Sequence, residues 1–255
     1  MILNIAKHET IRGIEGGVYY FNLHDYPHIS RDELKLAVAF VTYEQSNNRQ
    51  TEIVCDDEQL LATIKYAIAN PETVGKIILS ETTEFVYHAT GLSGTRGILS
   101  SGKLLSSVKV YKKTGEELAY EKRESPWNDP ADFFEYIMFC NGDDMTGDYV
   151  VLSENFPNEK DLGNGSFNAG VRFYIRSDAI TQHPGHVFDG YHPVKVKDEL
   201  SLSDYLYACI VPEQYKTELA GCILPELSSK IHYLSQRGLT LSDWNKKVYH
   251  YLTGR

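Results

Sequence analysis

One stretch decides the fold of this chain, and it reads Phe85-Val86-Tyr87-His88-Ala89-Thr90-Gly91-Leu92-Ser93-Gly94-Thr95-Arg96-Gly97-Ile98-Leu99-Ser100-Ser101-Gly102-Lys103-Leu104-Leu105. Its first six residues form an apolar and aromatic run that is typical of a buried strand, and Gly91 interrupts the pattern. The apolar positions then take helical spacing until Gly102, at Leu92, Thr95, Ile98 and Leu99. The sequence therefore predicts a histidine, His88, at the exit of a core strand and just before a helix.

Composition and charge bound the class of protein. The chain has 255 residues, 42% of them hydrophobic and 24% charged, which is ordinary for a globular protein with a full core. A formal net charge of −10 argues against general attraction to a phosphate backbone, so a protein or small-molecule partner is favoured over nucleic acid. A local basic groove stays open, because five cations lie in one segment: Lys109, Lys112, Lys113, Lys122 and Arg123.

The four cysteines favour a reducing compartment. They are far apart and form no CxxC pair, as expected for reduced thiols of a cytosolic protein: Cys55, Cys140, Cys209 and Cys222. We find neither a signal peptide nor an apolar run long enough for a membrane span. The expected location is the cytoplasm, and a toxin delivered into a host cell without a cleavable signal would have the same features.

Residues 1–80 predict a small α+β extension or docking module. Residues 18–21 form a β-prone run, 34–43 resemble a strand, and 52–55 are expected to return as its hairpin partner. A helix is predicted over 59–70, after an acidic start and before Pro71. Residues 81–255 then form the catalytic unit, with strands over 149–155, 171–175 and 205–212 and helices beginning near 224 and 242.

The strand with His-x-Thr at 88–90, followed by a helix with Ile98-Leu99 and Gly102, resembles the opening motif of the ADP-ribosyltransferase superfamily. Residues 147–153, Gly-Asp-Tyr-Val-Val-Leu-Ser, look like the second motif strand of the His-Tyr-x toxin-type branch. The segment around Asp178-Ala179-Ile180 has a weaker likeness to the RNA 2'-phosphotransferase branch. The resemblance implies an α+β fold with a split, mixed and antiparallel β-sheet core and flanking helices.

What the resemblance implies for function is an NAD-dependent mono-ADP-ribosyltransferase, a bacterial toxin or effector acting on a macromolecular acceptor. His88 would bond a ribose of NAD, with Ala89, Thr90 and Gly91 near the nicotinamide. Tyr149 would stack on the nicotinamide, with Ser153 close behind. Arg172 is the guanidinium expected to meet the pyrophosphate. Cleavage of the nicotinamide bond develops positive charge on the ribose, and an opposing carboxylate lowers that barrier.

One departure from the motif keeps other readings open. The closing strand ends in Cys209-Ile210-Val211-Pro212, and the family's usual glutamate position, four before the proline, is Ala208. Either the enzyme works without this acid, as the RNA phosphotransferase branch does, or another carboxylate supplies it. Asp204 is the candidate third catalytic residue, and Asp198, Glu199 and Glu213 also lie close in sequence. The alternative is a catalytically inactive NAD-binding or protein-binding member of the same fold.

A second alternative is a metal-dependent hydrolase. His183, His186, Asp189 and His192 recur every three residues and are suitable zinc ligands. However, Pro184, Gly185 and Gly190 disfavour the regular helix that would align them, so we predict no metal site. The acidic loop 141–148 lacks the spacing and final glutamate of a calcium-binding loop.

Overall fold

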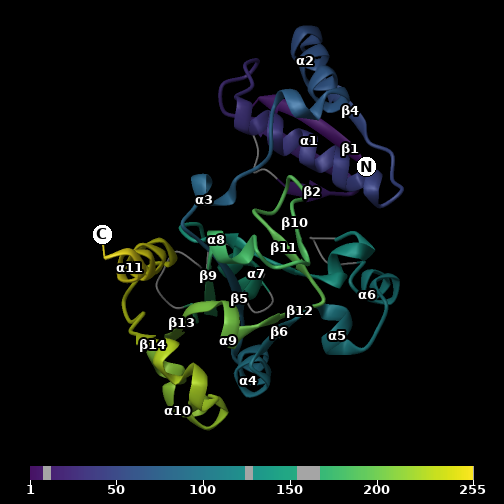
Figure 1. The fold of residues 1–255 in the computed structure, drawn as a ribbon. Helices are drawn as coiled ribbons and strands as arrows, with labels where there is room; N and C mark the ends of the chain where they lie inside the picture. The colour runs from purple at the N-terminus through teal and green to yellow at the C-terminus, as the bar shows by residue number, and fades with distance from the viewer. Residues whose placement is uncertain (8–12, 124–128, 154–166, 255) are drawn as a thin grey trace. The chain divides into compact units, whose positions relative to one another are not determined.

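A computed structural model describes residues 1–7, 13–123, 129–153 and 167–254 (Figure 1). The chain divides into two compact units. The first unit comprises Met1–Ile78, Ser107–Tyr136 and Val187–Lys195, and the second comprises Leu79–Ser106, Ile137–His186 and Val196–Arg255. The N-terminal part is thus not closed off by a single boundary near residue 80, because two later segments, 107–136 and 187–195, complete its unit.

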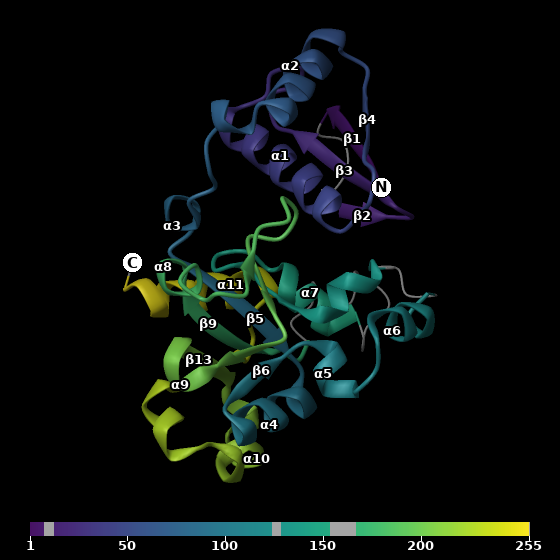
Figure 2. The ribbon, with the colours of Figure 1, turned by 45° about the vertical axis from the view of Figure 1, so that its right-hand side comes forward.

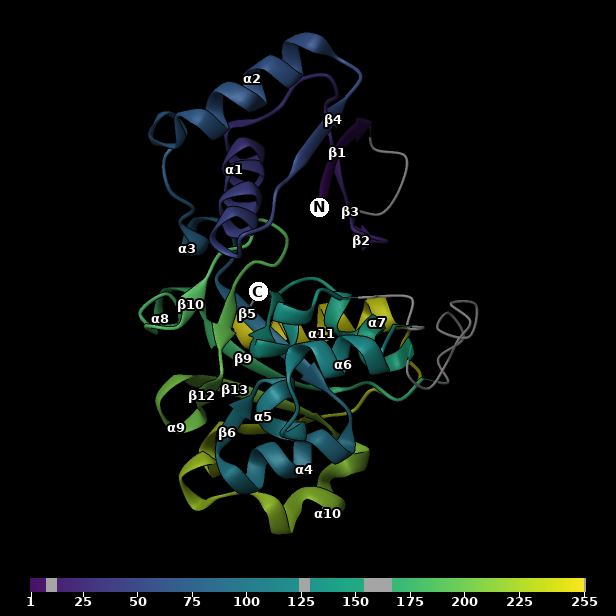
Figure 3. The same ribbon diagram turned by 90° about the vertical axis from the view of Figure 1, so that its right-hand side faces the viewer.

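The first unit is built on a four-stranded sheet in the order β2-β3-β1-β4. Its strands are β1 (Ile2–Lys7), β2 (Gly13–Glu15), β3 (Val18–Leu23) and β4 (Glu52–Cys55). β1 pairs in parallel with β3 and β4, whereas β2 is antiparallel to β3. Helices α1 (Arg31–Ser46) and α2 (Glu58–Ala69) cover one face, where Leu3 and Phe21 join a shared core with Phe40 and Ile64 (Figure 3).

The predicted hairpin over 34–55 is wrong, and the predicted helix over 59–70 is confirmed. Residues 31–46 form helix α1, which begins with a capping box between Ser30 and Glu33. Its β-branched and aromatic side chains resemble a strand locally, but Leu34, Ala37 and Val41 also have helical spacing. The cap and a core-facing stripe decide between the two patterns. β4 then pairs with β1 and not with 34–43.

The second unit is built on a five-stranded mixed sheet in the order β14-β13-β9-β5-β8. Its strands are β5 (Phe85–Thr90), β8 (Cys140–Asn141), β9 (Val171–Arg176), β13 (Leu206–Pro212) and β14 (Ile231–Leu234). β9 runs antiparallel to both β5 and β13, and β14 is parallel to β13. The strands predicted over 85–90, 171–175 and 205–212 are confirmed, and they are neighbours. Mixed sheets with helices confirm the predicted α+β class.

Three helices frame this sheet (Figure 2). α4 (Leu92–Ser101) follows β5 as predicted and ends at Gly102, which adopts the left-handed backbone (φ 68°) that glycine tolerates. α7 (Thr146–Ser153) and α11 (Leu241–Thr253) cover one face, where Leu152 and Trp244 pack with Tyr87 and Tyr174. The strand predicted over 149–155 is wrong as far as residue 153, because residues 146–153 are helical; residues 154 and 155 lie outside the described residues. The helix predicted to begin near 224 is a short 3₁₀ helix, Pro225–Lys230, and the residues from Ile231 onward, which were expected to continue it, form β14.

The connecting elements are short. β6 (Lys103–Leu105) and β12 (Glu199–Ser201) form an antiparallel pair, and β10 (His186–Val187), β11 (Lys195–Lys197) and β7 (Tyr136–Met138) form a separate small sheet. The short helices are α3 (Leu79–Thr82), α5 (Ser107–Tyr111), α6 (Gly115–Glu121), α8 (Ser177–Ile180), α9 (Leu202–Tyr205) and α10 (Lys216–Leu219). None of the helices in the described ranges is both long and apolar enough to cross a membrane.

Candidate functional site

His88 lies on β5, half-buried, with its ring edge-on to Phe139 at 6.2 Å between centroids. Its Nδ1 is 3.1 Å from the Met138 carbonyl oxygen. Because a carbonyl only accepts hydrogen bonds, Nδ1 carries the proton and Nε2 of the neutral ring is an acceptor. Burial lowers the pKa of His88, while the bond to Met138 opposes that shift. The ring is therefore held neutral, with Nε2 unprotonated.

The first turn of α4 follows directly after this strand. Gly91 precedes the helix with extended backbone (ψ 174°) and no side chain caps the turn, so its first N–H groups lack a side-chain acceptor. The Thr90 hydroxyl lies against Gly94, where an added Cβ would approach Thr90 Oγ1 to 2.3 Å. Gly94 is thus required for the close fit of Thr90 onto the helix.

Tyr149 does not lie near His88. Side chains alternate along β5, so Tyr87 and Ala89 point to the face opposite His88. That opposite face is covered by α7: the Tyr87 hydroxyl donates to Asp148 at 3.2 Å, and Gly147 lies against both Tyr87 and Ala89. Tyr149 belongs to α7 and is 38% exposed. The predicted convergence of His88 and Tyr149 is therefore wrong, and Ser153, at the end of α7, belongs to the element on that same face.

Arg172 is buried in a polar network and is not available to a pyrophosphate. It is fully buried together with Asp148, its ion-pair partner. Its guanidinium also donates to Tyr174 Oη at 2.8 Å and to Asn245 Oδ1 at 2.7 Å, and it stacks over Tyr87 at 4.8 Å. Each of these partners is an internal group, so Arg172 stabilises the face that carries α7 and α11.

The family's glutamate position, Ala208, faces away from His88, and Asp204 is an exposed residue of a short helix. Ala208 pairs in register with Tyr174 and shares its buried core, so it points to the face opposite His88. A glutamate at this position would point the same way. Asp204 is exposed on the four-residue helix α9, where its carboxylate accepts from Ser203 Oγ at 3.1 Å. The register of β13, which the sequence does not specify, causes this departure.

The first unit contains a buried charged cluster that the sequence analysis missed. Lys195 is fully buried, and its Nζ is 2.8 Å from Asp189 Oδ2, although the angles are not those of a hydrogen bond. The same ammonium lies over three rings, at 3.8 Å from the centroid of Tyr43, 4.0 Å from Phe133 and 4.7 Å from Tyr136. The rings lie on helices and strands that are distant in sequence, so no local pattern could reveal this cluster.

A second set of charges adjoins those rings. Tyr43 donates to Asp132, and Arg49 pairs with Asp132 and with the buried Glu44, each at 2.6 Å. Burial and the bond to Asp132 both raise the pKa of Tyr43. These groups satisfy one another inside the unit, and they hold segment 129–136 against α1.

The histidine-rich loop forms no metal centre in the described part of the chain. Asp189 Oδ1 accepts from the backbone N–H of Tyr191 and His192, and Oδ2 is 2.9 Å from His192 Nδ1. His183 Nδ1 accepts from the Gly185 N–H, and His186 Nδ1 bonds the His183 carbonyl. Among the residues described, no three His, Cys, Asp or Glu side chains are grouped to hold an ion.

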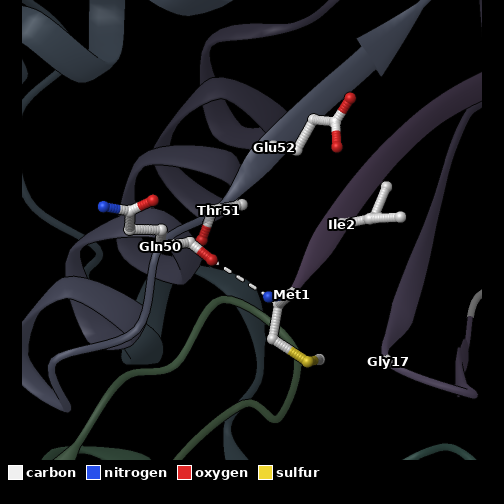
Figure 4. A pocket seen from close by; sticks show the side chains of 6 residues that line it. All are labelled: Met1, Ile2, Gly17, Gln50, Thr51 and Glu52. Carbon is white, nitrogen blue, oxygen red and sulfur yellow. Dashed lines mark hydrogen bonds between the residues drawn. The ribbon is translucent and has the colours of Figure 1, made fainter.

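The pockets among the described residues include one in each unit. One, in the first unit, is bounded by Met1, Ile2, Gly17, Gln50, Thr51 and Glu52, with the Met1 amine donating to the Gln50 carbonyl at 3.0 Å (Figure 4). The other, in the second unit, is lined by Asp143, Asn245, Lys246, Lys247, Tyr249 and His250. Neither includes His88, Thr90 or Gly91.

Comparisons of the chain with models of protein families, with curated proteins and with solved structures gave no match. Membership of the ADP-ribosyltransferase superfamily therefore stays a prediction from the motif residues.

Proposed function

We propose that this chain is an NAD-binding protein of the ADP-ribosyltransferase type that holds the dinucleotide at the β5–α4 junction. The observation that carries this proposal is the strand-to-helix turn, in which a neutral His88 precedes Thr90, Gly91 and an uncapped helix start. Further support comes from the sheet. The three strands whose sequences resemble the superfamily's motifs, β5, β9 and β13, are adjacent in it.

The residues at the β5–α4 junction are better suited to binding NAD than to cleaving it. His88 Nε2 is an acceptor for a ribose hydroxyl, and the first N–H groups of α4 can donate to a carboxamide or phosphate oxygen. Tyr149, Arg172 and Asp204 do not fit the roles that the resemblance implies, because two belong to the opposite face and the third is an exposed group of α9. Bound NAD would supply a nicotinamide–ribose bond whose cleavage needs an opposing carboxylate. The family's glutamate position is Ala208, which faces away from His88, so we propose binding without cleavage.

The second candidate function is mono-ADP-ribosyl transfer to a macromolecular acceptor, by a toxin or effector. It is favoured by the adjacency of β5, β9 and β13, and it requires a carboxylate from outside position 208, for which the sequence offers Asp204, Asp198, Glu199 and Glu213.

Isothermal titration with NAD tests the proposal, and release of labelled nicotinamide separates the two candidates. We expect NAD to bind, and His88→Ala to weaken binding by about tenfold, the effect of losing one hydrogen bond worth ~1.4 kcal/mol. His232→Ala is the matched control, because His232 is a half-buried histidine of the same sheet that bonds Tyr251.

We expect no nicotinamide release above the protein-free rate. If the wild type releases nicotinamide and His88→Ala does not, the proposal of binding alone is replaced by the proposal of transfer. Absence of any heat of NAD binding, or equal affinity of His88→Ala and wild type, would reject both candidates at this junction.

A further inference from the structure

Helices α5 and α6 of the first unit form an exposed aromatic surface, which we name the α5–α6 surface (residues 107–123). The two helices follow one another in the chain and lie side by side in every view (Figures 1, 2 and 3). Val110 is 55% exposed, Tyr111 57% and Tyr120 67%. Large apolar side chains this exposed are unusual in so short a segment, and clusters of them mark interaction sites.

The same surface is locally cationic within an acidic chain. All five of its cations are exposed: Lys109, Lys112, Lys113, Lys122 and Arg123. Two of its three glutamates have local partners, since Glu117 forms the capping box of α6 with Thr114 and Glu121 pairs with Lys113 at 2.6 Å. The surface therefore attracts anions, although the whole chain has a net charge of −10.

The guanidinium of Arg123 lies over the ring of Tyr120. The Arg123 guanidinium lies 4.1 Å from the ring centroid of Tyr120, and its Nη1 donates to the Tyr120 carbonyl at 2.7 Å. Planar rings and guanidinium planes are the groups on which unpaired bases stack. Lys122 lies over Phe134, 5.7 Å from its ring, on the 3₁₀ helix Ala131–Glu135 against which both α5 and α6 pack.

From this combination we infer that the α5–α6 surface binds single-stranded nucleic acid. Bases stack on Tyr111 and on the Tyr120–Arg123 pair, while the lysines contact the phosphates. Exposed bases are available in a single strand and hidden in a duplex, so the aromatic surface selects the single strand. This revises the expectation from net charge, which averages over the whole chain. The inference does not depend on NAD binding.

Fluorescence anisotropy of the full chain with a labelled oligothymidylate of about a dozen nucleotides tests the inference, because single-strand sites span ~4–16 nucleotides. We expect binding at low salt, and we expect Tyr120→Ala to weaken it about tenfold, within the range for loss of one stacked base. Tyr66→Ala is the control, since Tyr66 is 61% exposed on α2 of the same unit. We expect it to have no effect.

The dependence of affinity on salt concentration tests the role of the lysines. The double change Lys112→Glu, Lys122→Glu should weaken binding and reduce the slope of log affinity against log salt by about 1.4, or ~0.7 for each phosphate contact of a single strand. Lys65→Glu with Lys76→Glu is the charge-matched control. Circular dichroism of each variant establishes that the fold is retained.

Any of the following results would overturn the inference. One is absence of binding at low salt, and another is equal affinity of Tyr120→Ala and Tyr66→Ala. The third is tighter binding to a duplex of the same length, or binding to polyglutamate in place of the oligonucleotide, which would identify an acidic protein as the partner.

Discussion

Replacing Arg172 by methionine removes the charge from the most deeply buried ion pair of the second unit. Both Arg172 and Asp148 are 0% exposed, and the guanidinium also satisfies Asn245 Oδ1. Arg172→Met leaves the Asp148 carboxylate buried with only the Tyr87 hydroxyl and neighbouring backbone. Breaking a buried pair in this way costs about 3–5 kcal/mol. Because a whole protein is stable by only ~5–15 kcal/mol, we expect a large fall in the free energy of unfolding.

The assay is urea unfolding followed by the fluorescence of Trp244, which is fully buried in the core of the same face. The chain has two tryptophans, so a Trp127→Phe background leaves Trp244 as the single reporter. Arg176→Met is the matched control, because Arg176 is on the same strand but 47% exposed and pairs with the exposed Asp178. Exposed pairs contribute about 0–1 kcal/mol.

The reasoning also predicts partial recovery. Arg172→Met combined with Asp148→Leu removes both charges, so the double variant should be more stable than the single one. If Arg172→Met unfolds within about 1 kcal/mol of wild type, or no differently from Arg176→Met, the pair is not the buried, mutually dependent element described above.

Two further predictions concern the first unit. Neighbouring cations hold the pKa of Asp189 below its usual range in spite of burial. The carboxylate therefore contributes stability that is present above about pH 4 and is lost as pH falls through its folded pKa. Asp189→Asn should flatten the decline of the urea midpoint between about pH 4 and pH 2, and an unchanged decline would contradict this prediction. Gly190 has φ 71°, and a Cβ there would meet the Leu36 carbonyl oxygen at 2.2 Å. Gly190→Ala should therefore lower the free energy of unfolding by more than the ~1–2 kcal/mol of a left-handed residue. Urea unfolding measures this against Gly254→Ala, because Gly254 has the same left-handed backbone but open space around it.

Local signals in the sequence were enough where one residue type decides the backbone. Gly91 and Gly102 delimit α4, and Pro71 follows the end of α2, because glycine and proline act on the chain directly. The run 85–90 is a strand because its apolar and aromatic residues suit a pleated, buried surface. Where the side chains suit both structures, as in 31–46 and 146–153, the pattern alone predicted strands and the packing selected helices.

The sequence by itself determined the β5–α4 turn, the strands over 171–176 and 206–212, and the amphipathic final helix. Only the tertiary structure decided which side of the sheet each motif residue faces. It placed Arg172 and Ala208 with Tyr87 and opposite His88, and it enclosed Lys195 among three rings from two distant segments. Consecutive side chains along a strand point to opposite faces of the sheet, and the sequence alone predicts this alternation. Which face is covered depends on helices whose contacts with the sheet are long-range, so the sequence pattern does not determine it.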